Sequence, residues 1–113
     1  MPDAVQEVDA SSFEAEVLTG GLPTLVEFYS EGCAPCRMLK AILGRLAGEF
    51  AGRVKVCAVD AHANVDLGIR YRLQAVPTLV FFRDGEVVGA ARGLVGENVL
   101  RGKVERLVAG EVP

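Results

Sequence analysis

The sequence contains no tryptophan, one histidine and three cysteines in 113 residues. Three is a low and odd number of cysteines, which argues against a framework of structural disulfides and for thiols kept reduced in the cytoplasm. A large net charge is also missing, because 12 basic and 15 acidic side chains sum to −3. This balance leaves no basic surface for nucleic acid and no polybasic segment for an anionic membrane.

Long apolar runs are absent as well. No stretch approaches the roughly 18 apolar residues that a membrane-spanning helix requires, since charged side chains interrupt the longest blocks. Residues 1–10 carry acidic side chains, no basic start and no apolar stretch, so they do not resemble a secretory signal. We therefore expect a cytoplasmic protein with no membrane role.

Length and composition predict a single domain over residues 1–113. A chain of this size has room for one hydrophobic core, and its 50% hydrophobic and 24% charged residues are typical of a globular protein. No repeat, low-complexity tract or linker interrupts it.

Strand and helix patterns alternate along this domain. Apolar, β-favouring runs predict strands at 5–8, 23–30, 54–60, 78–83 and 86–92. Amphipathic spacing predicts helices at 9–19, 36–50, 65–71 and 95–108. Asp84 and Gly85 form a strong hairpin signal between the last two strands. The order predicts an α/β fold in which about four helices flank a central mixed sheet of about five strands.

Cys33 and Cys36 enclose Ala34 and Pro35 in a Cys-x-x-Cys motif where a predicted strand meets a predicted helix. Unpaired N–H groups and the positive end of the helix dipole stabilise a sulfur there as the thiolate. We therefore predict that Cys33 attacks disulfides and that Cys36 resolves the mixed disulfide. Pro35 suits a first helical turn, where its missing N–H costs no hydrogen bond.

Two other interpretations of the pair are a structural zinc site and two ordinary buried thiols. Zinc needs four ligands, and Cys57 and His62 are the remaining candidates. Cys57 lies in an apolar strand, where it is better explained as a small core residue, and His62 lies in a polar loop. Asp60, at a strand end, is better explained as a turn former than as a second proton-transfer group. The position of the motif favours redox chemistry.

These features together resemble the thioredoxin family over nearly the whole chain. The matching segments are 26–29, 33–36, 71–78, 82–86 and Gly93, in the order and spacing of the family. The resemblance implies the thioredoxin fold, reduction of disulfides in client proteins, no bound cofactor, and re-reduction by an NADPH-dependent flavoprotein reductase. We expect the chain to be a monomer.

The resemblance also assigns residues to a client groove. Val76 and Pro77 match a cis-proline loop that faces the cysteines, with Val76 offering backbone hydrogen bonds to an extended client; a trans proline that opens a strand is the alternative. Gly93 matches a glycine beside this groove, although a glycine near a strand end also fits a β-bulge.

Glu27 stands where the family has a buried aspartate that helps to deprotonate the second cysteine. Burial in so apolar a strand should raise the pKa of the carboxyl toward a value useful for proton transfer. The alternative is a structural carboxyl that finds a hydrogen-bond partner or water. Many family members also have a lysine near this carboxyl on the next strand, but Ala58 occupies that place here.

Other departures concern the surroundings of the pair. Gly32 and Tyr29 replace tryptophans, which predicts a thinner groove wall and a different set of partners. Ala34 and Ala41 replace a glycine and a proline, and the direction of their effect on the reduction potential does not follow from sequence. A specialised oxidant or isomerase, and a non-catalytic interaction subunit, are the alternatives to a reductase.

Overall fold

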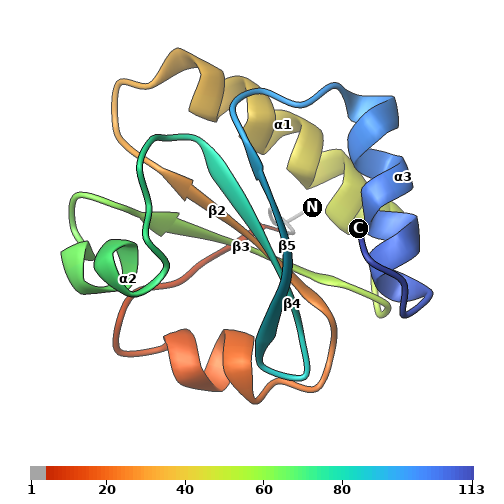
Figure 1. Cartoon of the computed structure of the whole chain (residues 1–113). Helices are drawn as coiled ribbons and strands as arrows, with labels where there is room; N and C mark the ends of the chain where they lie inside the picture. The colour runs from red at the N-terminus through yellow and green to blue at the C-terminus, as the bar shows by residue number, and fades with distance from the viewer. Residues whose placement is uncertain (1–4) are drawn as a thin grey trace.

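A computed structural model describes residues 5–113 and confirms the mixed α/β architecture (Figure 1). Residues 1–4, which belong to the predicted domain and to the N-terminal segment discussed above, lie outside the described residues. The strands in the described part are Val5–Glu7 (β1), Thr24–Tyr29 (β2), Lys55–Asp60 (β3), Thr78–Arg83 (β4) and Glu86–Arg92 (β5). Its helices are Glu14–Leu18 (η1), Ala34–Glu49 (α1), Val65–Arg70 (α2) and Glu97–Val108 (α3).

The strands form one sheet in the order β1-β3-β2-β4-β5. β1 and β2 run parallel to β3, whereas β4 is antiparallel to β2 and β5 antiparallel to β4. The predicted hairpin between β4 and β5 is confirmed, and Asp84 and Gly85 both have positive φ, at 53° and 79°. A Cβ at Gly85 would lie 2.8 Å from the carbonyl oxygen of Leu18, so only glycine fits there.

The predicted helix at 9–19 is wrong in its extent. Only a five-residue π-helix, η1, forms there. The Oδ1 atom of Asp9 accepts hydrogen bonds of 3.0 Å from the backbone N–H groups of Ser11 and Ser12, and this interaction holds the preceding residues in a turn. Asp9 thus makes the side-chain hydrogen bonds expected of a cap, and the helical residues that follow the turn are fewer than predicted.

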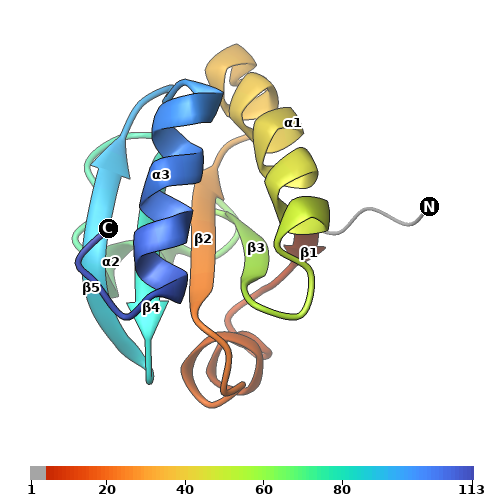
Figure 2. The same cartoon turned by 90° about the vertical axis from the view of Figure 1, so that its right-hand side faces the viewer.

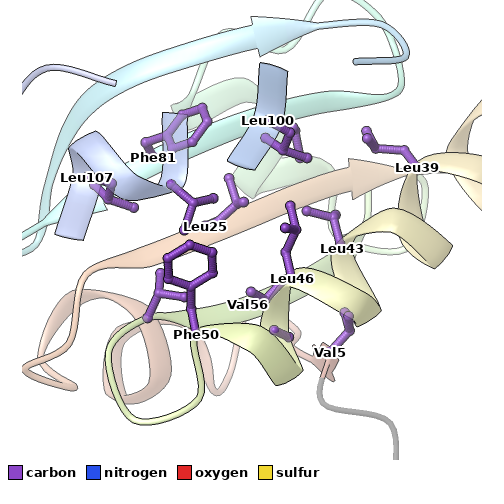
Figure 3. Close-up of a cluster of buried hydrophobic side chains, with 14 of the residues drawn as sticks. Val5, Leu25, Leu39, Leu43, Leu46, Phe50, Val56, Phe81, Leu100 and Leu107 are labelled. Atoms are coloured by element: carbon purple, nitrogen blue, oxygen red, sulfur yellow. The ribbon is translucent and has the colours of Figure 1, made fainter. Parts of the chain in front are cut away.

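Helices cover both faces of the sheet. α1 and α3 lie side by side on one face (Figure 2), where side chains from both helices meet the sheet in the larger core cluster (Figure 3). Phe13, which caps η1, Val17 of η1 and Leu67 of α2 belong to a second cluster on the opposite face. Side chains alternate along β2, so Leu25 packs under α1 and α3 whereas Phe28 packs in the second cluster. β2 is therefore buried on both faces, as its apolar sequence predicts.

Candidate redox site

The strand register brings three separate segments to one end of the sheet. Phe28, near the end of β2, pairs with Thr78, the first residue of β4, and Thr78 pairs with Arg92, the last residue of β5. The loop that leads from β2 into α1 therefore lies beside the segment before Thr78 and beside Gly93. Cys33, Pro77 and Gly93, which are distant in the sequence, come from these three segments.

Cys33 and Cys36 form a disulfide at the start of α1, with their Cα atoms 5.2 Å apart. The helix begins at Ala34, earlier than predicted, because Cys33 is the N-cap and Pro35 occupies the first turn. The Sγ of Cys33 accepts a hydrogen bond of 3.2 Å from the backbone N–H of Cys36. Cys33 is half-buried, whereas Cys36 is only 2% exposed. A bulky partner can therefore reach Cys33 but not Cys36.

The bond between Val76 and Pro77 is cis, as the family resemblance implies. The Oγ1 atom of Thr78 donates a 2.7 Å hydrogen bond to the carbonyl of Ala75 and closes the turn around this bond. The backbone N–H of Gly93 donates to the carbonyl of Pro77 at 2.9 Å. Gly93 lies just beyond the end of β5, and the register shift between β4 and β5 is at 81–82, so Gly93 is not a bulge residue.

Glu27 is completely buried in the middle of β2. Neither of its carboxylate oxygens has a hydrogen-bond partner among residues 5–113, so the structure supplies none of the protein partners that a purely structural carboxyl requires. Removal from water raises the pKa of Glu27 to about 7; the charge of Lys40 opposes this shift and that of Glu7 adds to it. The carboxyl can therefore gain or lose a proton near neutral pH.

A cavity of about 240 Å³ lies between the redox loop and α1, with Tyr29, Gly32, Cys36 and Lys40 in its wall. Gly32 has a φ of 79°, and a Cβ on it would meet no atom within 4 Å. The backbone here needs glycine for its conformation, and the absent side chain leaves the cavity open. Ala34 and Ala41 are exposed, and α1 continues unbroken past Ala41.

A larger hollow of about 410 Å³ is lined by Val76 and by residues of α2. Val65 and Ile69 of α2 line it, and their side chains are 57% and 71% exposed. No motif in the sequence marks these two residues as part of a site. Their spacing of four places them on one face of the helix, but a sequence pattern cannot show that the core uses Leu67 instead.

Cys57 does not approach the redox pair. Its side chain is fully buried in the second core cluster, on the face of the sheet opposite α1, and burial raises the pKa of the thiol to about 11. No three metal-binding side chains gather anywhere in the described chain. Asp60 accepts hydrogen bonds from the backbone N–H groups of His62 and Ala63, at 3.0 and 3.2 Å, so it forms a turn as expected.

A disulfide at a strand-to-helix junction, beside a cis-proline turn, on a sheet of this topology defines a dithiol–disulfide oxidoreductase with the thioredoxin fold. The family model named Thioredoxin matches residues 4–106. The chain belongs to the thioredoxin family. Within residues 5–113, no helix combines the length and the apolar character needed to cross a bilayer.

Curated relatives agree with this family. The chain is 39% identical to a thioredoxin of Thiocapsa roseopersicina, over 77% of this chain and 96% of the relative. It is 35% identical to thioredoxin C-2 of Corynebacterium nephridii, over 84% and 88% of the two chains. It is 33% identical to a thioredoxin of Pseudomonas aeruginosa, over 88% and 93%. The family requires no bound cofactor, and its chemistry is exchange between a dithiol and a disulfide.

Proposed function

We propose that the chain works mainly as a reductant of disulfides in client proteins, with Cys33 as the attacking sulfur and Cys36 as the resolving sulfur. The observation that carries this assignment is the asymmetry of the pair. Cys33 is the half-exposed N-cap of α1, where an N–H group points at its sulfur, whereas Cys36 is buried in the first turn. The exposed sulfur is the one whose ionised form is stabilised.

The reaction has two exchanges. The Cys33 thiolate attacks a client disulfide, a bond forms between Cys33 and one client sulfur, and the other client sulfur leaves as a thiolate that takes a proton. Cys36 then loses its proton and attacks the Sγ of Cys33. The bond to the client breaks, the Cys33–Cys36 disulfide forms, and the second client sulfur leaves and is protonated. Two electrons pass from the protein to the client.

Glu27 is our candidate for the group that takes the proton of Cys36. Both residues belong to the layer between β2 and α1, and both are shielded from bulk water. A carboxyl whose pKa is about 7 is half ionised at neutral pH and can accept this proton and later return it. A carboxyl with an ordinary pKa would be a weaker base.

Val76, Pro77 and Gly93 form the proposed client groove next to Cys33. The backbone N–H and carbonyl of Val76 have no partner within residues 5–113, so an extended client segment can pair with them as an added strand does. The hollow beyond Val76, with the exposed Ile69 and Val65, then receives an apolar side chain of that segment.

We also propose the context of the cycle. After one turnover the pair is oxidised, and an NADPH-dependent flavoprotein reductase returns the two electrons. A pair that works as a reductant needs a reducing compartment, which supports a cytoplasmic location. We further propose that the active form is a monomer, which light scattering of the purified protein tests.

Reduction of insulin disulfides, coupled to NADPH and candidate flavoprotein reductases, tests the proposed function. The wild-type chain should turn over repeatedly, and Cys33→Ser/Cys36→Ser should be inactive. A non-catalytic interaction subunit would retain its biological activity in that double variant. The reduction potential of the Cys33–Cys36 couple separates a reductant from an oxidant or isomerase, because a reductant lies well below the roughly −180 to −120 mV of oxidising family members.

A further inference from the structure

We propose that Glu7, Tyr29 and Lys40 form an outer charge cluster over the buried Glu27, in which Lys40 is a positioning residue that compensates the carboxylate when it ionises. This inference rests on the proposed role of Glu27 as the proton carrier. It assigns a function to three side chains that lie outside the Cys-x-x-Cys motif and the client groove.

The sheet register places Glu7 and Glu27 in one row. Glu7 of β1 pairs with Ala58 of β3, and Ala58 pairs with Glu27 of β2. Residues paired in this way point to the same face of a sheet, and neighbouring strands are about 4.8 Å apart, so the two glutamates stand in one row about 10 Å apart. Ala58 is the residue between them in this row. A carboxylate at the exposed edge of the sheet thus lies in the same row as a buried carboxyl.

α1 places a cation, Lys40, beside this row. The Nζ atom of Lys40 lies 3.7 Å from one carboxylate oxygen of Glu7 and 5.3 Å from the centre of the Tyr29 ring. The hydroxyl of Tyr29 donates a 2.6 Å hydrogen bond to the other oxygen of Glu7. Tyr29 follows Glu27 by two positions on β2, so both side chains point to the same face.

Lys40 is held loosely in this cluster. Its distance to Glu7 exceeds the 2.7–2.9 Å or so of a strong charge-assisted hydrogen bond, and its side chain is 37% exposed. The ammonium can therefore shift between Glu7 and a newly ionised Glu27 at little cost. Tyr29, in contrast, is fixed by its short hydrogen bond to Glu7.

The charged groups around Glu27 are few. β1 contributes Glu7 and α1 contributes Lys40, while the paired residues on β3 and β4 are the uncharged Ala58 and Leu79. Lys40 lowers the pKa of Glu27 and Glu7 raises it. The two surface charges thus act on the buried carboxyl in opposite directions.

Arg37 of α1 is a second basic residue beside the cluster, since it lines the same cavity as Tyr29 and Lys40. Two further acidic groups act on Tyr29. Burial and the hydrogen bond to Glu7 raise the pKa of the Tyr29 phenol. The charges of Asp60, at the end of β3, and Glu31, in the redox loop, raise it further. Tyr29 therefore stays protonated and serves as a hydrogen-bond donor.

The cluster also borders a cavity beside the resolving cysteine. Tyr29, Cys36 and Lys40 line the same 240 Å³ cavity. The outer cluster is therefore close to both the proposed proton carrier and the sulfur whose proton it takes.

The test is a titration of the Glu27 carboxyl in the oxidised protein, by carbon NMR or by difference infrared spectroscopy. We expect Lys40→Gln to raise the midpoint by about 0.5 pH unit and Glu7→Gln to lower it by a similar amount, as partly exposed charges do. Lys40→Arg keeps the positive charge and should titrate like the wild type. Lys103→Gln, which removes a lysine from α3, is the matched control and should leave the midpoint unchanged.

Opposite shifts of the Glu27 midpoint in Lys40→Gln and Glu7→Gln support the proposal. If the cluster had a purely structural role, both substitutions would shift the midpoint in the same direction. Equal shifts of one sign, or no shift in either variant, would overturn it. The difference between Lys40→Gln and the wild type should also shrink at about 1 M salt, where screening is strong. No client takes part in this titration, so its outcome is independent of catalysis. The proton-carrier role is decided separately, by the effect of Glu27→Gln on the rate at which Cys36 resolves the mixed disulfide.

Discussion

The backbone N–H of Cys36 donates a hydrogen bond to the Sγ of Cys33, while the sulfur of Cys36 itself lies beneath the first turn of α1. In the reduced protein the same N–H group can stabilise a thiolate at Cys33, while the buried Cys36 stays inaccessible to a folded client. The attacking role of Cys33 and the resolving role of Cys36 follow from this geometry, because only an accessible and ionised sulfur can begin an exchange with a folded client.

Single cysteine variants should therefore behave differently. Cys36→Ser keeps the attacking sulfur but cannot resolve the intermediate, so it should accumulate a mixed disulfide with clients on a non-reducing gel. Cys33→Ser should trap nothing, because the remaining sulfur is buried. Both variants should lose insulin-reducing activity by about 10²-fold or more. A mixed disulfide trapped on Cys36 in Cys33→Ser would contradict the assignment.

Glu27 should make the folded state less stable as the pH rises through the acidic range. Below about pH 4.5 the carboxyl is protonated in both the folded and the unfolded chain; between 4.5 and about 7 only the unfolded chain loses the proton. The free energy of unfolding should therefore fall over this window, by about 3 kcal/mol in total, and level off above it.

Glu27→Gln removes this dependence. Urea unfolding of the oxidised protein at several pH values measures the free energy of unfolding of both proteins. Between pH 4.5 and 7 this free energy should increase in the variant relative to the wild type. Parallel stability curves for the two proteins would show that the carboxyl titrates normally in the folded state.

Cys57 should be chemically silent in the native protein. Burial raises the pKa of its thiol to about 11 and no solvent reaches it. A thiol reagent should modify Cys33 rapidly in the reduced protein, Cys36 more slowly, and Cys57 only after unfolding. Cys57→Ala should retain full reductase activity. Modification of Cys57 on the timescale of Cys33 would mean that the core opens far more readily than its packing indicates.

Gly93→Ala should cost stability and client affinity together. The φ of Gly93 is 79°, a conformation that alanine adopts at a cost of about 1 kcal/mol, although a Cβ there would meet no atom within 4 Å. That Cβ would also enter the open space where the client is proposed to lie. Thermal unfolding and the KM for a client disulfide measure the two effects.

Gly48→Ala is the matched control for Gly93→Ala. Gly48 is in α1, has no positive φ and also faces open space, so alanine there should stabilise the helix by about 0.5–1 kcal/mol without changing the KM. An unchanged KM in Gly93→Ala as well would remove Gly93 from the groove.

Local patterns predicted much of the fold and of the site. The hairpin at 84–85, the doubly buried β2 and the amphipathic α1 depend on neighbouring residues, so they were visible in the sequence. The redox pair was equally visible, because its chemistry depends on a spacing of a few residues. The helix predicted at 9–19 is present but shorter, with η1 at Glu14–Leu18. The Asp9 side chain accepts from the N–H groups of Ser11 and Ser12, the pattern of the predicted cap, but the residues it caps form a turn.

Strand pairing and the packing of helices on the sheet could not be predicted from the sequence. Glu7 and Glu27 share a row only through the pairing of β1, β3 and β2, and Lys40 meets them only through the packing of α1 on the sheet. A single sequence does not show which residues pair between strands that are so far apart in the chain. The exposure of Ile69 was missed for the same reason, since it depends on which face of α2 the core uses.

Titration of the Cys33 thiol in the reduced protein tests the central claim most directly. Thiolate absorbance near 240 nm, recorded against pH in the Cys36→Ser variant, follows Cys33 alone, because Cys57 ionises only near pH 11. The account predicts that Cys33 ionises within the range of about 3.5–7.5 found for thiols at helix N-termini. A midpoint near 8.5, the value of a free thiol in water, would contradict it.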